Sequence, residues 1–152
     1  MVHINHRIGV KASLPEVYQA LATVNGVSNW WTKNVSGESS IGKNMLLKFH
    51  NLDGKELGNM NIQIVNLIPE KTVHWKFIFG PEEWIGTEVI FELHQEKDYT
   101  IVMFSHINWT EEVAFKSHCS MKWAVFLLSL KQFIETGQGN PAPNDIKIDN
   151  WN

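Results

Sequence analysis

A long amphipathic segment without helix-breaking residues, near the end of the chain, most constrains how it can fold. Residues 113–135 contain neither glycine nor proline, and an α-helix over this range would be about 34 Å long, roughly the breadth of a small domain. A glycine- and proline-rich stretch follows, so residues 137–152 are expected to form a C-terminal tail. One wide face of the predicted helix is apolar and consists of Phe115, Cys119, Trp123, Phe126, Leu127, Leu130, Phe133 and Ile134.

The segment before this helix alternates between apolar and polar residues with a period of two. The alternation runs from about residue 41 to residue 107 and predicts five half-buried antiparallel strands. In the last of these strands both faces carry apolar residues. If its inward face is formed by Val102, Phe104 and His106, then its outer face carries a patch that is a candidate homodimer contact, namely Ile101, Met103 and Ile107.

The beginning of the chain predicts one strand and two short helices. His3–Val10 is expected to form the strand, and Ser13 to cap an amphipathic helix over residues 14–23. A second short helix is expected to carry Trp30 and Trp31, with one of these side chains in the core and the other half exposed.

This order of elements predicts a single α+β domain over residues 1–152. An antiparallel sheet of about six strands twists and curls, so it has one concave face. A single helix about 10 Å across does not fill that concavity. The remaining volume must either be plugged by large side chains or be left as an apolar cavity.

Composition favours an aromatic pocket and excludes several other kinds of site. The chain of 152 residues contains seven Trp, eight Phe and two Tyr, and ligand pockets use Trp and Tyr because each combines an apolar ring with one polar group. The net charge of −3 and the single arginine provide no basic stripe for nucleic acid. With no HExxH, CxxC or GxGxxG pattern, neither a metal nor a cofactor is expected.

Localisation is expected to be cytoplasmic by default. No signal-peptide-like run and no apolar stretch of membrane-spanning length is visible in the sequence. The lone Cys119 agrees with this expectation, because a disulfide framework needs at least two cysteines.

Four sequence blocks resemble a known superfamily. These blocks are Ala20-Leu21 with Thr23, Gly26 and Trp30-Trp31-Thr32; residues 84–89 with Phe91 and Leu93; Phe104-Ser105-His106 with Trp109; and Ser129-Leu130-Lys131 with residues 134–137, Gly139 and Pro141. Together they resemble the START-like (SRPBCC) superfamily, and within it the branch named after activators of a heat-shock chaperone's ATPase. The resemblance runs from about residue 5 to residue 145. One departure is Asn108, where members often have glycine, which leaves the shape of the turn and the pocket rim open.

The resemblance implies a helix-grip fold with a cavity between the sheet and the long helix, but it implies no fixed chemistry. The candidate ligand-binding residues are Trp30, Trp31, Leu47, Phe49, Ile62, Trp75, Phe77, Val89, Phe91, Phe104, His106, Trp123 and Leu127. His106 is the best candidate for a catalytic acid or base, helped by Glu88 if that strand is flipped. The alternative for His106 is a buried, hydrogen-bonded histidine, and the alternative for a nucleophilic Cys119 is a small core residue.

Three functions follow as hypotheses. The first is binding or transport of a small hydrophobic molecule, lipid-like or polyketide-like, in an internal cavity. The second is a cyclase or aromatase that uses the same cavity and His106. The third is a chaperone-modulating module, and it ranks last because the chaperone-activating members of the branch carry an additional N-terminal domain that is not expected here.

Overall fold

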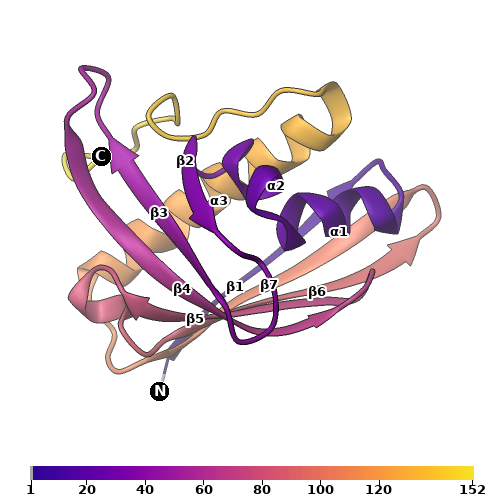
Figure 1. Ribbon diagram of the computed structural model, residues 1–152, viewed down its shortest axis with the longest axis horizontal. Coiled ribbons are helices and arrows are strands. Elements are labelled where there is room, and N and C mark those ends of the chain that lie inside the picture. The colour runs from indigo at the N-terminus through magenta and orange to yellow at the C-terminus, as the bar shows by residue number, and fades with distance from the viewer. Residues whose placement is uncertain (1) are drawn as a thin grey trace.

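Seven antiparallel strands, five of them formed by the alternating segments, make one curved sheet in the computed structural model, which describes residues 2–152 (Figure 1). The order across the sheet is β1-β7-β6-β5-β4-β3-β2, so the first strand pairs with the last. The strands are β1 (Val2–Val10), β2 (Asn34–Gly37), β3 (Asn44–His50), β4 (Glu56–Ile68), β5 (Thr72–Phe79), β6 (Glu88–Glu96) and β7 (Tyr99–Trp109).

Three α-helices and a short 3-10 helix complete the domain. They are α1 (Leu14–Ala22), α2 (Val24–Ser28), η1 (Glu82–Trp84) and α3 (Ala114–Thr136). The Ser13 hydroxyl caps α1 by accepting a hydrogen bond from the Glu16 backbone N–H at 3.4 Å. At the other end of the chain, Gly137 ends α3 in the left-handed conformation with φ 90°, which glycine adopts without strain.

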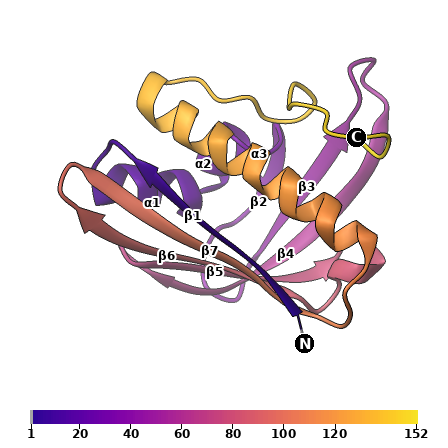
Figure 2. The same ribbon diagram turned by 180° about the vertical axis from the view of Figure 1, so that it is seen from behind.

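Helix α3 lies across the concave side of the sheet, as the view from behind shows (Figure 2). The inward positions of five neighbouring strands supply the core beneath it, and all of them are buried: Leu47, Ile62, Trp75, Phe77, Val89, Phe91, Val102, Phe104 and His106. The predicted α+β helix-grip fold is therefore confirmed, and in the last strand, whose facing the sequence left open, Val102, Phe104 and His106 face inward.

Several details of the prediction were wrong. The sheet has a seventh strand, β2, and η1 interrupts the turn after β5. Trp30 and Trp31 lie in the turn that follows α2 rather than within it, and both are buried instead of only one. The outer patch on β7 is smaller than expected, because Ile101 is only 4% exposed while Met103 is 42% exposed.

Asn108, the residue at which the sequence departs from the pattern it resembles, has a left-handed backbone. Its φ is +72°, in the left-handed region that glycine and asparagine tolerate better than other residues. Its side-chain amide donates to Glu88 Oε2 at 3.1 Å, and its backbone N–H donates to His3 Nδ1 at 3.1 Å. Asn108 lies within β7 rather than in a turn, beside the irregularity in the pairing of β7 with β1, and its side chain adds one hydrogen bond that glycine would lack.

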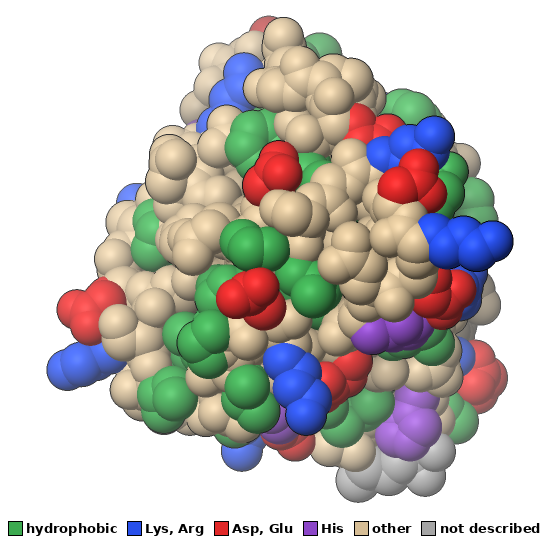
Figure 3. All heavy atoms as spheres, turned by 90° about the vertical axis from the view of Figure 1, so that its right-hand side faces the viewer, with side chains coloured by type: hydrophobic (Ala, Val, Ile, Leu, Met, Phe, Trp, Pro, Cys, Tyr) green, Lys and Arg blue, Asp and Glu red, His purple; other side chains and the backbone are tan. Residues whose placement is uncertain are grey.

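The charges on the surface are mixed in sign. On the face drawn in Figure 3, basic and acidic side chains are interspersed among polar and apolar ones. In the part of the chain that the structure describes, no helix is long and apolar enough to cross a membrane.

Candidate functional site

Aromatic side chains fill the centre of the space between the curved sheet and α3. Trp31 stacks on Trp75 with ring centroids 5.8 Å apart and contacts Trp123 at 4.9 Å. Trp84 in turn stacks on Trp123 at 5.8 Å, and Trp75 packs edge-on against Phe91 at 5.0 Å. These contacts plug the centre of the concavity, so any open volume must lie toward an end.

A pocket of about 160 Å³ lies at the end of the grip formed by the N-terminal half of α3. The β3–β4 hairpin, η1 and the tail form its other walls. Its apolar lining consists of Trp31, Phe49, Leu57, Met60, Pro81, Trp84, Phe115, Cys119, Trp123, Phe126 and Ala142. Its polar lining consists of His50, His118, Lys122, Asp145, Lys147 and Asn152.

The structure divides the sequence-predicted ligand residues into two groups. Trp31, Phe49 and Trp123 line the pocket. The other candidates are buried in the packed core: Trp30, Leu47, Ile62, Trp75, Phe77, Val89, Phe91, Phe104, His106 and Leu127. The alternation of the strands identified inward positions but did not distinguish a filled interior from a pocket at its end.

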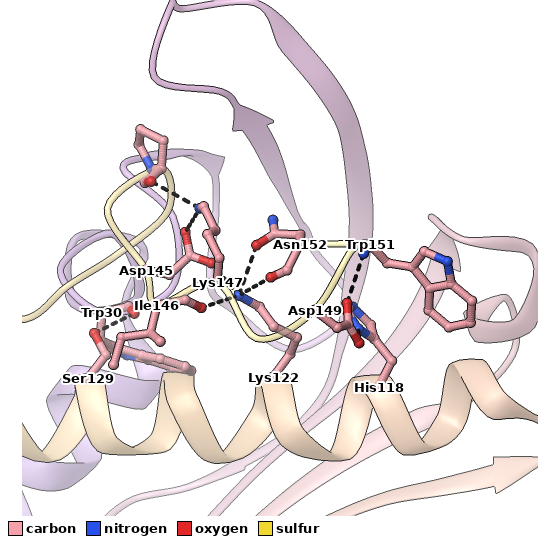
Figure 4. Close-up of polar contacts among 11 residues, drawn as sticks. Trp30, His118, Lys122, Ser129, Asp145, Ile146, Lys147, Asp149, Trp151 and Asn152 are labelled. Atoms are coloured by element: carbon pink, nitrogen blue, oxygen red, sulfur yellow. Dashed lines mark hydrogen bonds and ion pairs between the residues drawn. The ribbon is translucent and has the colours of Figure 1, made fainter.

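Sequence reasoning missed the polar wall of the pocket, which the tail and α3 build together (Figure 4). Lys122 Nζ on α3 donates to Asp145 Oδ2 at 2.5 Å and to the Ile146 carbonyl at 2.9 Å. Lys147 Nζ donates to Asp145 Oδ1 at 2.9 Å, so both carboxylate oxygens contact an ammonium. Burial alone would raise the pKa of Asp145, but the two ammonium groups outweigh burial and hold that pKa below its ordinary value.

The tail is fixed to the fold by backbone and side-chain bonds. The Ala142 N–H donates to the Trp31 carbonyl at 2.8 Å, and Ala142 is buried. Ser129 of α3 donates its hydroxyl proton to the Trp30 carbonyl at 2.8 Å and accepts from the Asn140 N–H at 2.8 Å. The tail therefore forms a wall of the pocket, and it also holds the Trp30-Trp31 turn in place.

Close backbone contact requires glycine at position 139. A Cβ atom there would lie 2.5 Å from the Asn29 carbonyl oxygen and 2.9 Å from the Ser129 carbonyl oxygen. Both distances are shorter than real Cβ contacts allow. A side chain at this position would push the tail away from α3 and from the turn that follows α2.

His106 is buried behind the pocket, and both of its ring nitrogens are hydrogen-bonded. The Trp123 indole N–H donates to His106 Nδ1 at 3.1 Å, so a neutral ring carries its proton on Nε2 and donates it to Thr87 Oγ1 at 2.8 Å. The Thr87 hydroxyl then donates to the Trp84 carbonyl at 2.6 Å. Burial lowers the pKa of His106 to about 3, so the ring is neutral at physiological pH.

Glu88 does not reach this network. Its strand is not flipped, and its carboxylate lies on the outer face of the sheet, where Glu88 Oε1 is 2.7 Å from His74 Nε2. The expectation that Glu88 assists His106 is therefore wrong.

Cys119 lies in the pocket wall but is not an activated nucleophile. Its side chain is buried, and burial raises the pKa of its thiol to about 12. Across residues 2–152 the structure contains no group of three or more His, Cys, Asp or Glu side chains arranged to hold a metal ion.

Comparison with protein families matches residues 11–135 to the family described as activator of Hsp90 ATPase homolog 1-like protein. Among solved structures, the chain is 46% identical to the Aha1 dimer from Colwellia psychrerythraea, with a TM-score of 0.79 over 91% of this chain and 100% of that one. A comparison with curated protein sequences found no similar protein.

More distant structures share the fold alone. CalU16 from Micromonospora echinospora is 22% identical, with a TM-score of 0.74 over 97% of this chain and 74% of that one. DynU16, from the dynemicin biosynthetic locus, is 18% identical, with a TM-score of 0.74 over 90% of this chain and 48% of that one. The present chain thus spans about half the length of DynU16. The resemblance to the START-like superfamily that the sequence blocks indicated is confirmed.

Proposed function

Since the chain belongs to the activator of Hsp90 ATPase homolog 1-like family, whose fold grips a helix within a curved sheet, we propose that it binds a small apolar molecule. The binding site is the pocket at the N-terminal half of α3. The observation that carries this proposal is the aromatic wall formed by Trp31, Phe49, Trp84 and Trp123 around a volume of about 160 Å³. Apolar cavities of about 150 Å³ accept guests the size of benzene, so the pocket suits one ring or a short branched chain.

Binding is favoured over catalysis by the state of the groups that would do chemistry. His106 is neutral, and its two ring nitrogens are bonded to Trp123 and Thr87. Cys119 is protonated at physiological pH because its thiol pKa is raised to about 12. Neither of the two groups that the sequence suggested for chemistry is therefore a prepared acid, base or nucleophile.

Native mass spectrometry of freshly purified protein, followed by organic extraction, tests the proposal. We expect an excess mass that extraction removes, or thermal stabilisation by members of an apolar single-ring library. The proposal fails if the mass is that of the bare chain and no library member raises the melting temperature.

Two methionine variants assign the binding to this pocket. Met60→Trp places a larger side chain in the pocket wall, and Met103→Trp makes the same change on the outer face of the sheet. We expect Met60→Trp to weaken binding by about tenfold or more, because overfilled sites exclude their guests. Met103→Trp should leave affinity unchanged. Equal affinities for the two variants would place the ligand elsewhere.

We also propose that the chain self-associates as a homodimer. The support is the 46% identical protein from Colwellia psychrerythraea, which is described as a dimer. Sedimentation velocity over a wide concentration range measures this directly. A monomer at every concentration would refute the proposal.

A further inference from the structure

The charges that line the pocket are unequal, and this inequality bears on the kind of molecule bound. The ionisable groups of the lining are His50, His118, Lys122, Asp145, Lys147 and Cys119. Cys119 is neutral, so the side chains of the lining carry two ammonium groups against one carboxylate, while the Asp149 carboxylate, outside the lining, contacts His118 at 2.8 Å. Glu83 of η1 also approaches Cys119, but it is exposed and does not line the pocket.

The charged groups in the polar wall of the pocket also have more unmatched hydrogen-bond donors than unmatched acceptors. Both oxygens of Asp145 already accept from lysines. Lys122 has acceptors for all three of its N–H groups, in Asp145, Ile146 and Asn152. Lys147 has two acceptors among the described residues, Asp145 Oδ1 and the Pro143 carbonyl, so one of its three N–H groups remains available.

A second donor in the pocket lining lies on η1. The indole N–H of Trp84 is buried and has no hydrogen-bond partner among residues 2–152. The Cys119 sulfur beside it is only a weak acceptor. An unmatched buried donor costs free energy unless a partner arrives. The unmatched groups of Lys147 and Trp84 are both donors, so the polar end of a bound molecule would meet a free donor, and an anionic oxygen suits the charged donor of Lys147.

We infer that the pocket binds an amphipathic carboxylate, with its apolar body against the aromatic wall and its carboxylate near Lys147. The inference rests on the proposed function and names its class of ligand. Lys147 is the accessible member of the cluster, since its side chain is 49% exposed while that of Asp145 is 1% exposed. Figure 4 shows Lys147 on the tail above α3, with Asp145 between it and Lys122.

A matched pair of probes tests the inference: 4-phenylbutyrate and the neutral alcohol of the same skeleton, 4-phenylbutan-1-ol. Binding is followed by the tryptophan indole N–H signals in NMR titrations. We expect the carboxylate to bind about fivefold more tightly than the alcohol, a difference typical of one partly exposed charge contact. That preference should weaken as salt is added.

Three lysine variants assign the preference to one side chain. Lys147→Gln should abolish it, and Lys147→Arg should retain it, because arginine keeps the charge. Lys71→Gln removes the same charge from the exposed turn between β4 and β5, at the opposite end of β4 from the pocket, and should leave the preference intact. Equal melting temperatures for Lys147→Gln and Lys147→Arg show that the tail stays folded.

Three other outcomes would each refute a specific claim about the pocket. Equal binding of carboxylate and alcohol refutes the anion preference and leaves the proposed function standing. Loss of the preference in Lys71→Gln as well as in Lys147→Gln shows a long-range effect of net charge and refutes the role of Lys147. Failure of both probes, together with the whole apolar library, refutes the proposed function and this inference with it.

Discussion

Replacing His106 by asparagine should make the free energy of unfolding less sensitive to a fall in pH. In the folded protein burial lowers the pKa of His106 to about 3, while its ordinary value is 6.5. The unfolded chain therefore takes up a proton below pH 6.5 that the folded chain refuses until about pH 3. Since the unfolded state binds more protons in this window, the free energy of unfolding falls as the pH falls.

The size of the effect follows from the two pKa values. Between pH 6.5 and pH 3, each pH unit costs about 1.4 kcal/mol of stability. Moving from about pH 7.5 to about pH 5 should therefore remove about 2 kcal/mol through His106 alone. Asparagine does not titrate in this range, and its side-chain oxygen can still accept from the Trp123 indole N–H.

Urea unfolding of the parent protein and His106→Asn at these two pH values measures the difference. The variant will be less stable overall, but its loss on acidification should be smaller by about 2 kcal/mol. All other titrating groups are common to both proteins and cancel. Parallel losses would refute the neutral, buried imidazole, as would an NMR spectrum in which the Nε2–H tautomer disappears well above pH 5.

Three further predictions concern the tail and the pocket wall. Lys122→Met should lower the free energy of unfolding by about 3 kcal/mol, because the buried carboxylate of Asp145 keeps only Lys147 as a partner. Amide hydrogen exchange in residues 140–152 should become faster. Unchanged protection there would contradict the role of the Lys122–Asp145 pair in holding the tail. Gly139→Ala should cost about 2 kcal/mol through the backbone clash, whereas Gly58→Ala, where a Cβ meets open space, should be nearly neutral in the same thermal melts. Cys119, with its thiol pKa near 12, should react with a disulfide reagent at about pH 8 only after unfolding, and rapid labelling of the native protein would show that the pocket opens far more than its walls indicate.

The sequence predicted most of the fold because its signals are local. Period-two alternation identified the inward faces of β3 to β6, and the Ser13 cap marked the start of α1, whereas the facing of β7 stayed open because both of its faces carry apolar residues. Strand β2 was missed because it has only four residues and a single half-buried side chain, Val35, so no alternation is visible. Trp30 and Trp31 were assigned to the second short helix because the sequence pattern does not distinguish the last turn of α2 from the non-helical turn that follows it.

The site was less predictable because it depends on chain segments that return from a distance. Lys122 and Asp145 are 23 positions apart, and their contact depends on how far the tail runs back along α3. His106 was identified as a polar residue of the interior, but its pairing with Trp123 depends on the register of α3 against β7. Alternation shows on which face of a strand a residue lies, but it does not show which residues of a helix contact which residues of the sheet.

The pairing of β1 with β7 has a consequence for how the molecule assembles. Asn5 lies opposite Ser105, 100 positions further along the chain, and a hydrogen bond joins their side chains. Contacts of such long sequence separation require a large loop to close before they contribute any stability, and they slow folding. The hairpins from β3 to β7 connect near neighbours and can form early, so β1 should dock late. We therefore expect refolding on the millisecond-to-second scale, and during synthesis β1 should stay unpaired until β7, the last strand of the sheet, has left the ribosome.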